Sequence, residues 1–461
     1  MRLLGAKLAL ARAVGVLARR AGRGGTSLPG KVLLRMEPGA LEALAGRLEN
    51  GAAVISATNG KTTTAGMAAE ILGRAGHVLV HNRAGANMAG GVASALLDAA
   101  QVGGGGIRTA GDLGLFEVDE FWLEEVTTAL RPRALLLGNL FRDQLDRYGE
   151  LDSIAERWRR VASTRPSGSA LLLNADDPAV ADLGRGQEDV TYFGVEDPGV
   201  ALPGMQHAAD AKHCRNCGHA YVYAVVFLAH LGHYHCPSCG RMRPAPTVAA
   251  ERVVLHGTRS AELTLRASGQ RVDVALPLPG LYNVYNALAA AALALSLGAT
   301  LEQVRAGLEG VSAAFGRAET VAVAGRPLQI LLVKNPAGAN EVLRTLALEG
   351  EELELLGILN DGIADGRDVS WVWDADWEVL AGRIARVTCA GTRAGELALR
   401  LKYAGIPPER LHVVPEVSAA LDAAVGADGA GTVHALPTYT ALLALRDELA
   451  RRGLAPRWSE A

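Results

Sequence analysis

The sequence predicts an α/β protein with two mostly parallel β-sheets and a small cysteine-rich insertion in the first. Apolar runs of strand length alternate with helix-patterned stretches from about residue 46 to 200, and the same alternation returns after about 320. Alternation of this kind is typical of parallel sheets covered by helices. We therefore expect an N-terminal segment 1–45, a central domain 46–315 and a C-terminal α/β (Rossmann-like) domain 316–461.

The N-terminal segment starts with a basic amphipathic stretch, MRLLGAKLALARAVGVLARRAGRGG. Lys7, Arg12, Arg19 and Arg20 interrupt its apolar residues, so it lacks the continuous apolar core of a signal peptide. Two interpretations are open: a helix docked on the following domain, or a helix that contacts an anionic membrane surface. Later stretches lack the roughly 18 uninterrupted apolar residues of a membrane-spanning helix. We expect a cytoplasmic protein, with peripheral binding at the inner face of the membrane as a further possibility.

A phosphate-binding loop is predicted directly after the first strand. Residues 56–64, SATNGKTTT, follow the apolar run AAVI and precede the helix-like stretch AGMAAEILGRAG. Backbone amides at such a helix start bind phosphate, Lys61 brings a positive charge, and Thr62 can bind magnesium. Ile55 stands where the full P-loop pattern has its first glycine, so this is a shorter loop. Its candidate ligand-binding residues are Thr58, Asn59, Gly60, Lys61, Thr62 and Thr63.

Polar residues cluster where the predicted strands of the central domain end. The strands are the runs AAVISA, HVLVH, LGLFEV, ALLLGNL and ALLLNADD. Ligands of open α/β sheets bind outside the carboxyl ends of the strands, so these side chains are candidates for one site. They are Lys61, Thr62, Asn82, Glu117, Asn139, Asp143, Asn174 and Asp176. We expect the glycine-rich stretch 103–114 to be a mobile loop.

An insertion at about 205–245 holds four of the five cysteines in the pattern C-x2-C-x18-C-x2-C. They are Cys214, Cys217, Cys236 and Cys239. Four thiolates in two tight turns suit tetrahedral zinc, and a site with four protein ligands is closed and structural. Two disulfides are the alternative, which a chain without a signal peptide disfavours. We expect the neighbouring histidines to be surface residues: His213, His219, His230, His233 and His235.

Beyond the insertion, two β-like runs, RVVLHG and AELTLR, lead to an Ala-rich helix, LPGLYNVYNALAAAALALSLG, with Asn283 and Asn286 in its first turns. The C-terminal runs are LQILLV, LELLGIL, ARVTCAG, LHVVP and TVHALP. The fifth cysteine, Cys389, lacks the Gly-x-Cys-x-Gly elbow of a nucleophile, because Val387 holds the first glycine position. We therefore expect Cys389 to be a buried strand residue.

In their order along residues 50–335, several motifs resemble those of the Mur ligases. They are TNGKTTT, the acid in FEVDE, GNLFRDQLDRYG, LNADD, GLYNVYNALAA and FGRAE. Mur ligases make an acyl phosphate from ATP and a carboxylate, and an amine then displaces the phosphate. The residues that this resemblance implies at the nucleotide are Lys61, Thr62, Glu117, Asn283 or Asn286, and Arg317. The first three would hold ATP and Mg²⁺, an asparagine would contact the adenine nucleotide, and the arginine would reach the phosphates from the domain junction.

Departures from the Mur ligase pattern indicate a separate branch. Ala57 stands where Mur ligases usually have glycine, Gln144 where they have histidine, and Trp158 where many have a lysine that becomes carbamylated. The resemblance therefore does not extend to a second magnesium site of the usual kind. About 45 residues precede the first strand, in place of a domain that grips a UDP-sugar precursor, so the substrate should be bound differently.

The chain is similar to the MurT family over essentially its whole length. The similarity is carried by the four-cysteine insertion and by NDGIADGRDVSWVWD, GTRAGELALRLKYAG and LPTYTALL. Members of this family are the synthetase subunits of lipid II isoglutaminyl synthase, which amidate the α-carboxylate of D-glutamate in the lipid II stem peptide to D-isoglutamine. Ammonia comes from glutamine through a separate class I glutamine amidotransferase, GatD. The resemblance therefore implies a GatD-like partner in a heterodimer, contacting the C-terminal domain, and lipid II as the substrate.

The acidic segment NDGIADGRDVSWVWDADWE follows one of the C-terminal apolar runs. Most of its aspartates should be ordinary loop acids. The resemblance implies that one of them orients the catalytic histidine of the partner glutaminase, and we rank Asp368 first, then Asp365 and Asp361. Trp371 and Trp373 are candidates for the docking surface.

Two other functions remain open. The chain could be another Mur-type amide ligase, such as a folylpolyglutamate synthase-like enzyme, although the cysteine insertion argues against this. It could also be a zinc-ribbon module that binds nucleic acid or a scaffold, with an inactive nucleotide site. A formal net charge of −3 offers no basic surface for nucleic acid, and the full set of polar residues at the strand ends argues against an inactive site.

Overall fold

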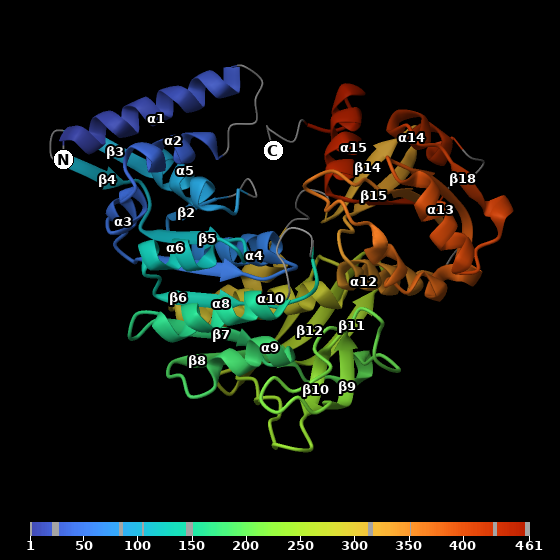
Figure 1. The fold of residues 1–461 in the computed structure, drawn as a ribbon, viewed down its shortest axis with the longest axis horizontal. Coiled ribbons are helices and arrows are strands. Elements are labelled where there is room, and N and C mark those ends of the chain that lie inside the picture. Colours follow the sequence, from blue (N-terminus) through green and yellow to red (C-terminus); the bar gives the residue numbers. More distant parts are fainter. Residues whose placement is uncertain are drawn as a thin grey trace.

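The computed structural model describes residues 2–20, 27–82, 86–103, 106–143, 151–311, 317–350, 352–426 and 431–456. A nine-stranded sheet forms the centre of the larger part of the molecule (Figure 1), in the order β13-β12-β11-β8-β7-β6-β1-β5-β2. From β2 to β11 the strands run parallel, and β12 and β13 add an antiparallel edge. The strands are β1 (Ala52–Ser56), β2 (Leu79–His81), β5 (Leu113–Glu117), β6 (Ala134–Leu137), β7 (Ala170–Asn174), β8 (Val190–Val195), β11 (Val248–His256), β12 (Ser260–Ala267) and β13 (Gln270–Leu276). The mostly parallel sheet is confirmed.

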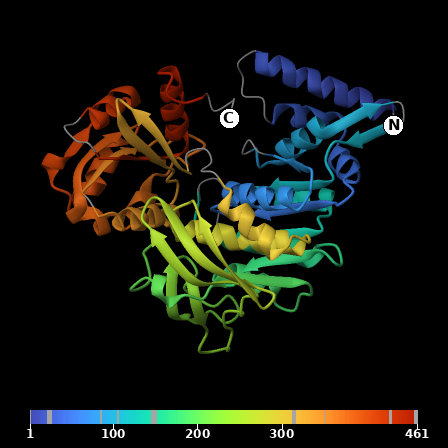
Figure 2. The same ribbon diagram turned by 180° about the vertical axis from the view of Figure 1, so that it is seen from behind.

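Helices cover both faces of this sheet. One face carries α4 (Lys61–Arg74), α10 (Leu281–Ser296) and α11 (Leu301–Glu309), and Figure 2 shows α10 and α11, in yellow, beside α4, in blue. The other face carries α5 (Ala89–Ala99), α6 (Leu123–Leu130), α8 (Leu151–Thr164) and α9 (Pro178–Ala181). In β1, Ala53 and Ile55 join one core while Ala52 and Val54 join the other. Burial on both faces explains why this strand is an uninterrupted apolar run.

The N-terminal residues form three helices, α1 (Arg2–Arg20), α2 (Leu28–Met36) and α3 (Ala40–Ala45). Leu8 and Ala11 of α1 are buried in the core that α2 and α5 complete. The Lys7 ammonium donates to Glu37 Oε2 at 2.9 Å and to Met36 O at 2.8 Å. The first interpretation, docking on the chain's own domain, is therefore confirmed for the buried face of α1. Among the described residues, no helix combines the length and the hydrophobicity needed to cross a membrane.

The glycine-rich stretch 103–114 contains more regular structure than we expected. Its first residues belong to a short antiparallel hairpin of β3 (Ala100–Gly103) and β4 (Gly106–Thr109), and its last residues begin β5. The expectation of a loop throughout is therefore wrong. Glycine favours tight hairpin turns, so a glycine-rich run is compatible with two short paired strands as well as with a loop. Residues 104–105 lie outside the described residues.

A six-stranded mixed sheet follows, in the order β14-β15-β19-β16-β17-β18. Its strands are β14 (Arg317–Val323), β15 (Arg326–Leu331), β16 (Leu353–Ile358), β17 (Ile384–Ala390), β18 (Leu411–Val413) and β19 (Val433–Pro437). The helices are α12 (Pro336–Ala347), α13 (Ala394–Tyr403), α14 (Val417–Val425) and α15 (Tyr439–Arg451). Cys389 lies fully buried in β17, and burial raises the pKa of its thiol to about 12. The prediction of a buried strand cysteine is confirmed.

Candidate functional site

The loop between β1 and α4 is built around Gly60. This residue has φ +84°, which favours glycine, and a Cβ atom there would lie 2.0 Å from Asn286 Oδ1 and displace that side chain. The same Asn286 oxygen accepts from the Thr64 hydroxyl at 3.3 Å, and the Asn286 amide donates to Asn283 Oδ1 at 3.1 Å. The start of α10 therefore lies directly against the loop, with Asn286 in contact and Asn283 behind it.

Lys61, the first residue of α4, is held in an ion pair. Its ammonium donates to Glu120 Oε2 at 2.9 Å and also to Ala57 O, and both charged side chains are only 11% exposed. Burial opposes the charge on Lys61, but the carboxylates of Glu120 and Asp119 outweigh burial and raise its pKa. Burial likewise opposes the charge on Glu120, but Lys61 and Lys334 keep its pKa low. Both partners are therefore charged, and the Lys61 ammonium can bind an anionic ligand at the loop.

Glu117 ends β5, beside the central strand β1, and is 1% exposed. The side-chain amide of Asn82 bonds the backbone of Glu117 twice, at 3.0 Å and 2.8 Å. Within the described part of the chain, the buried Glu117 Oε2 has no hydrogen-bond partner. A buried carboxylate oxygen without a donor is costly unless a cation neutralises it. This oxygen therefore fits a magnesium ligand.

Asn139, which follows β6, holds the phosphate loop in place by hydrogen bonds. Its side chain accepts from Asn59 N at 2.9 Å and donates to Asn59 O at 3.0 Å, and its carbonyl accepts from Thr58 N at 3.0 Å. The side chain of Arg317 lies outside the described residues. Of the predicted loop residues, Thr58 and Thr63 are buried, and Asn59 and Thr62 are half-buried.

The C-terminal domain reaches this loop through two residues that the sequence did not single out. Asn335 caps α12 by accepting from Gly338 N at 2.9 Å, and it exchanges side-chain hydrogen bonds with Asn59 at 2.9 Å and 3.2 Å. Lys334 donates to Thr58 O at 3.2 Å and forms an ion pair with Asp143. The available signal was the Asn-Pro pair after a strand, a helix start. Glu120 was also missed, although it belongs to the quoted motif FEVDE.

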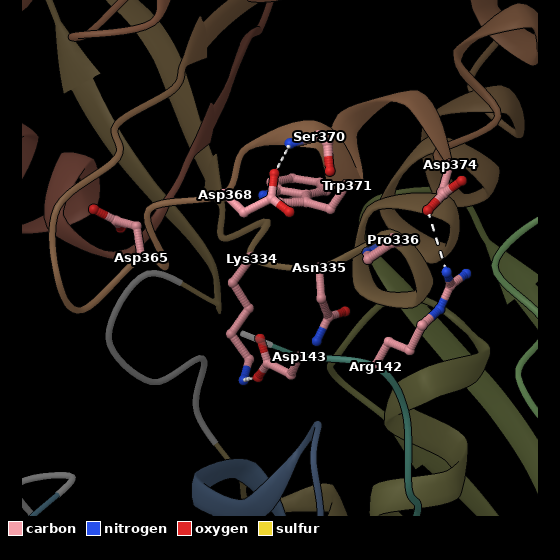
Figure 3. A pocket seen from close by; sticks show the side chains of 10 residues that line it. All are labelled: Arg142, Asp143, Lys334, Asn335, Pro336, Asp365, Asp368, Ser370, Trp371 and Asp374. Carbon is pink, nitrogen blue, oxygen red and sulfur yellow. Dashed lines mark hydrogen bonds and ion pairs between the residues drawn. The ribbon is translucent and has the colours of Figure 1, made fainter. Parts of the chain in front are cut away.

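A pocket opens beside this junction (Figure 3). It is lined by Arg142, Asp143, Lys334, Asn335, Pro336, Asp365, Asp368, Ser370, Trp371 and Asp374. Figure 3 shows Lys334 and Asp143 pointing toward one another from the two domains, with Asp368 above them. A second, largely apolar pocket lies on the loop and is lined by Gly60, Tyr282, Tyr285, Asn286, Leu331 and Val342, among others. Its apolar walls suit a flat aromatic base.

The three ranked aspartates have different environments. Asp365 is buried and accepts from Thr440 N at 2.7 Å and from Gly362 N at 3.1 Å. Both oxygens of Asp361 are paired, with the Thr392 hydroxyl and Arg393, each at 2.8 Å.

Asp368 is the exposed member of the three. It accepts from Ser370 N at 2.8 Å, and its bonds to the backbone and hydroxyl of Ser370 keep its pKa low. Its environment leaves the carboxylate ionised and open to a partner.

Four cysteines gather at the predicted ribbon, around the hairpin of β9 (Val222–Leu228) and β10 (Leu231–His235). All four sulfurs lie within 4.8 Å of one another. Cys214 Sγ and Cys239 Sγ are 3.6 Å apart, and Cys217 Sγ and Cys236 Sγ 3.4 Å. These distances exceed a disulfide bond of about 2.05 Å and approach the roughly 3.8 Å between thiolates on tetrahedral zinc. The backbone amide of Arg241 lowers the pKa of Cys239 to about 6, whereas burial raises the pKa of Cys236 to about 11. The capacity to bind a metal therefore follows from the closeness of the four sulfurs.

The ribbon contacts both the central domain and the C-terminal domain. Arg344 on α12 donates to Phe227 O in β9 at 2.7 Å. His230 is fully buried, 4.8 Å from the ring of Phe141. The expectation of a surface histidine is therefore wrong at this position, because the hairpin turn faces the central domain; its apolar neighbours in FLAHLG were the available signal.

Trp158 is fully buried in the core beneath α8. The position at which many Mur ligases have a carbamylated lysine therefore belongs to the packing of the core here. Gln144, the second departure in this region, lies outside the described residues.

Two family models match the chain: "Mur ligase middle domain" over residues 55–224 and "MurT ligase C-terminal" over residues 332–442. The MurT subunit of lipid II isoglutaminyl synthase (glutamine-hydrolyzing) from Staphylococcus aureus strain N315 is 32% identical over 444 residues, which cover 96% of this chain and 97% of that protein. The corresponding subunit from Streptococcus pneumoniae strain R6 is 32% identical over 441 residues, covering 94% of each chain.

Solved structures show the same fold at lower identity. A pseudomurein peptide ligase type C from Methanothermus fervidus superposes with a TM-score of 0.69 at 22% identity, covering 89% of this chain and 80% of that one. A folylpolyglutamate synthase from Mycobacterium tuberculosis, complexed with ADP, superposes with a TM-score of 0.61 at 18% identity, covering 90% of this chain and 92% of that one. The predicted Mur ligase fold is confirmed.

Proposed function

The chain belongs to the family of MurT subunits of lipid II isoglutaminyl synthase, and on this premise we propose that it is the ATP-dependent ligase subunit of such a synthase. It amidates the α-carboxylate of D-glutamate in the lipid II stem peptide to D-isoglutamine. The observation that carries this proposal is the edge of the sheet beside the glycine loop. There the Lys61 ammonium lies near Glu117, whose buried Oε2 lacks a hydrogen-bond partner among the described residues.

The loop residues would bind the phosphates of ATP. Backbone amides at the start of α4 face the phosphates, and Lys61 exchanges Glu120 for a phosphate oxygen. Thr62 and Glu117 would hold Mg²⁺, which neutralises charge on the phosphates when it is bound. The apolar pocket between Tyr282 and Leu331 would take the adenine, next to Asn286.

The reaction needs two displacements. A carboxylate oxygen of the substrate attacks the terminal phosphorus of ATP, and the bond from that phosphorus to the bridging oxygen breaks. The products of this step are an acyl phosphate and ADP. The lone pair of ammonia then attacks the acyl carbon, phosphate departs, and the nitrogen loses a proton to give the amide. Lys61 and Lys334 donate to two adjacent loop carbonyls, Ala57 O and Thr58 O. Their charges would there stabilise the negative charge that develops on the phosphate oxygens.

Ammonia should come from a partner, a GatD-like class I glutamine amidotransferase. Glutamine hydrolysis by such enzymes needs a nucleophilic cysteine, whereas Cys389 is buried and the remaining four cysteines form one cluster. Delivery from an attached glutaminase raises the local ammonia concentration. In this proposal Asp368, the exposed aspartate of the ranked three, orients the catalytic histidine of the partner.

Exposed aromatic residues of the same C-terminal domain support a docking surface. Trp373 is 48% exposed and Tyr403 71%, with ring centroids 5.8 Å apart. Arg400 is buried and lies 5.5 Å from the Trp373 ring, so it supports that ring from within the domain. Aromatic side chains are enriched at protein interfaces. Trp371 differs from Trp373 because it lines the pocket beside Lys334.

The metal of the ribbon should be zinc, and its role structural. All four ligands are thiolates from the chain, so no position is left for a substrate. The ribbon supports α12 through Arg344, and Asn335, which caps α12, bonds to Asn59 of the phosphate loop. Zinc would thereby stabilise the junction between the domains.

The site assignment is tested by Lys61→Ala and Glu117→Ala. Each variant should fold, since neither side chain packs in the apolar core, and each should lose amidation of lipid II with ammonium and ATP, measured as ADP release and amidated product. Lys212→Ala and Glu125→Ala, at exposed positions away from the loop, are the matched controls and should keep full activity. Folded Lys61 and Glu117 variants that amidate at the normal rate would disprove the assignment.

A further inference from the structure

The outward face of α1 has an unusual composition for a helix on the surface. Every exposed side chain of α1 that the structure describes is apolar. These residues are Ala6, Ala9, Leu10, Ala13, Val16 and Leu17. Leu10 is 55% exposed, Val16 41% and Leu17 64%. A helix that covers a soluble domain normally turns charged and polar residues outward, so this face is built for contact with something other than water.

The inward face of α1 is already occupied. Leu8, Ala11, Gly15 and Ala18 are buried at helical spacing. The two described basic side chains are also engaged: Lys7 with Glu37, and Arg12 with the carbonyls of Leu97 and Ala100. The apolar outward residues therefore belong to a second face, separate from the one that docks α1 on the domain.

The apolar surface continues beyond the helix. Val102 in β3 is 53% exposed, and a Cβ atom on Gly5 would lie 3.4 Å from its side chain. Figures 1 and 2 both show α1 at the outer edge of the molecule, with α2 and α5 on its inner side. The C-terminal domain, with its exposed aromatic residues, lies on the other side of the molecule, so a partner docked there leaves α1 uncovered.

Charge identifies the occupant of this face. The first 36 residues contain eight Lys and Arg, and Glu37 is the first acidic residue of the chain. A second copy of this chain would bring the same positive segment against itself, which like charges oppose. An apolar strip on a segment with only positive charges is typical of helices that lie in the headgroup region of anionic membranes.

We propose that α1 is a membrane-docking helix that inserts Leu10, Val16 and Leu17 between the headgroups of a bilayer containing anionic lipids. This inference rests on the proposed function, because it assumes a lipid-linked substrate, which lies at a membrane surface. The docked helix would hold the ligase at the surface while the lipid-linked carboxylate enters the site. The basic segment would add attraction to lipid phosphates, which salt weakens.

The test is sedimentation of the full-length protein with vesicles of phosphatidylcholine alone and of phosphatidylcholine with one-third phosphatidylglycerol. Wild type should bind the anionic vesicles more tightly than the neutral ones. Leu10→Glu/Leu17→Glu should lower the partition coefficient about 10–100-fold, since burial of one leucine contributes about tenfold. Leu348→Glu, at a leucine 48% exposed in the C-terminal domain, is the control and should bind as wild type.

Amidation of detergent-solubilised lipid II with ammonium, measured in parallel, separates this inference from the proposed function. Both leucine variants should keep that activity and the wild-type melting temperature. Three results would each overturn this inference without affecting the proposed function. They are active protein that does not bind anionic vesicles, equal binding to both vesicle types, and unchanged binding by the double variant. A smaller oligomer for the double variant in gel filtration, without an effect on vesicle binding, would assign the face to contact between copies and also overturn it.

Discussion

Lys334 and Asp143 should act as one unit in the ligase reaction. The ion pair joins the C-terminal domain to the central domain, and Lys334 also donates to Thr58 O of the phosphate loop. Replacing Lys334 by Met removes the bridge and leaves the carboxylate of Asp143 buried without its partner. We expect Lys334→Met and Asp143→Asn each to lower kcat/KM, and the double variant to lose little beyond the worse single one.

The burial of the pair sets the size of this coupling. The side chains are 28% and 10% exposed, so screening by water is partial. Two unit charges in contact at an effective dielectric constant of 20 attract by about 5 kcal/mol, and desolvation offsets much of that. Measured couplings of close interfacial charge pairs begin at about 1.5 kcal/mol. A coupling of about 2 kcal/mol, or about 30-fold in kcat/KM, is therefore the expectation.

The assay is ammonia-dependent amidation of lipid II by the chain alone, for wild type, both single variants and the double variant. A second cycle with Arg305→Met and Glu309→Gln provides the control, because that ion pair lies 2.9 Å apart on α11, with side chains 35% and 31% exposed. The control cycle should leave kcat/KM unchanged. Fully additive losses at Lys334 and Asp143, or normal activity of Lys334→Met, would refute the assignment of the junction as part of the active site.

Three further predictions concern the metal, the partner and pH. The purified chain should contain one zinc, and Cys214→Ser should lose it together with solubility or thermal stability before the ammonia reaction suffers; absence of zinc with four free thiols would contradict this. In the complex, Asp368→Asn should keep ammonia-dependent turnover while glutamine-dependent turnover falls about 10²–10⁴-fold; equal losses on both routes would place Asp368 in the ligase site. Burial lowers the pKa of His434 from 6.5 to about 4, so between these values the unfolded chain binds a proton that the folded chain does not. Stability should therefore fall by up to about 3 kcal/mol as pH drops through this window, and His434→Gln should lack this component in urea unfolding; an identical pH dependence would contradict the argument.

The sequence best predicts those elements whose structure is determined by residues close together in the chain. The apolar run before Lys61 is buried on both faces, so it could be assigned to a central strand without knowledge of its neighbours. Gly60 followed by a helix start carries its own signal, because the loop needs a left-handed residue there. The spacing of the four cysteines is equally local, and it predicts the cluster that the structure brings together.

Residues that act through contacts between distant segments could not be found in this way. Asn335 pairs with Asn59 across 276 positions of the chain, and no pattern near either residue specifies the other. The acidic segment has the same difficulty. Asp365 differs from Asp368 only after folding, when Thr440 of α15 donates to the first and the second stays exposed. His230 lies in a hairpin turn whose burial depends on the domain beneath it.

The central claim is that this chain makes an amide from ammonia and leaves glutamine hydrolysis to a partner. Its most direct test is to incubate the purified full-length chain with lipid II, ATP and Mg²⁺, first with ammonium and then with glutamine, and to follow ADP and the amidated stem peptide by mass spectrometry. We predict product from ammonium with the chain alone, and product from glutamine only when the glutaminase is added. Glutamine hydrolysis by this chain alone, or no amide from ammonium with folded protein, would contradict the account.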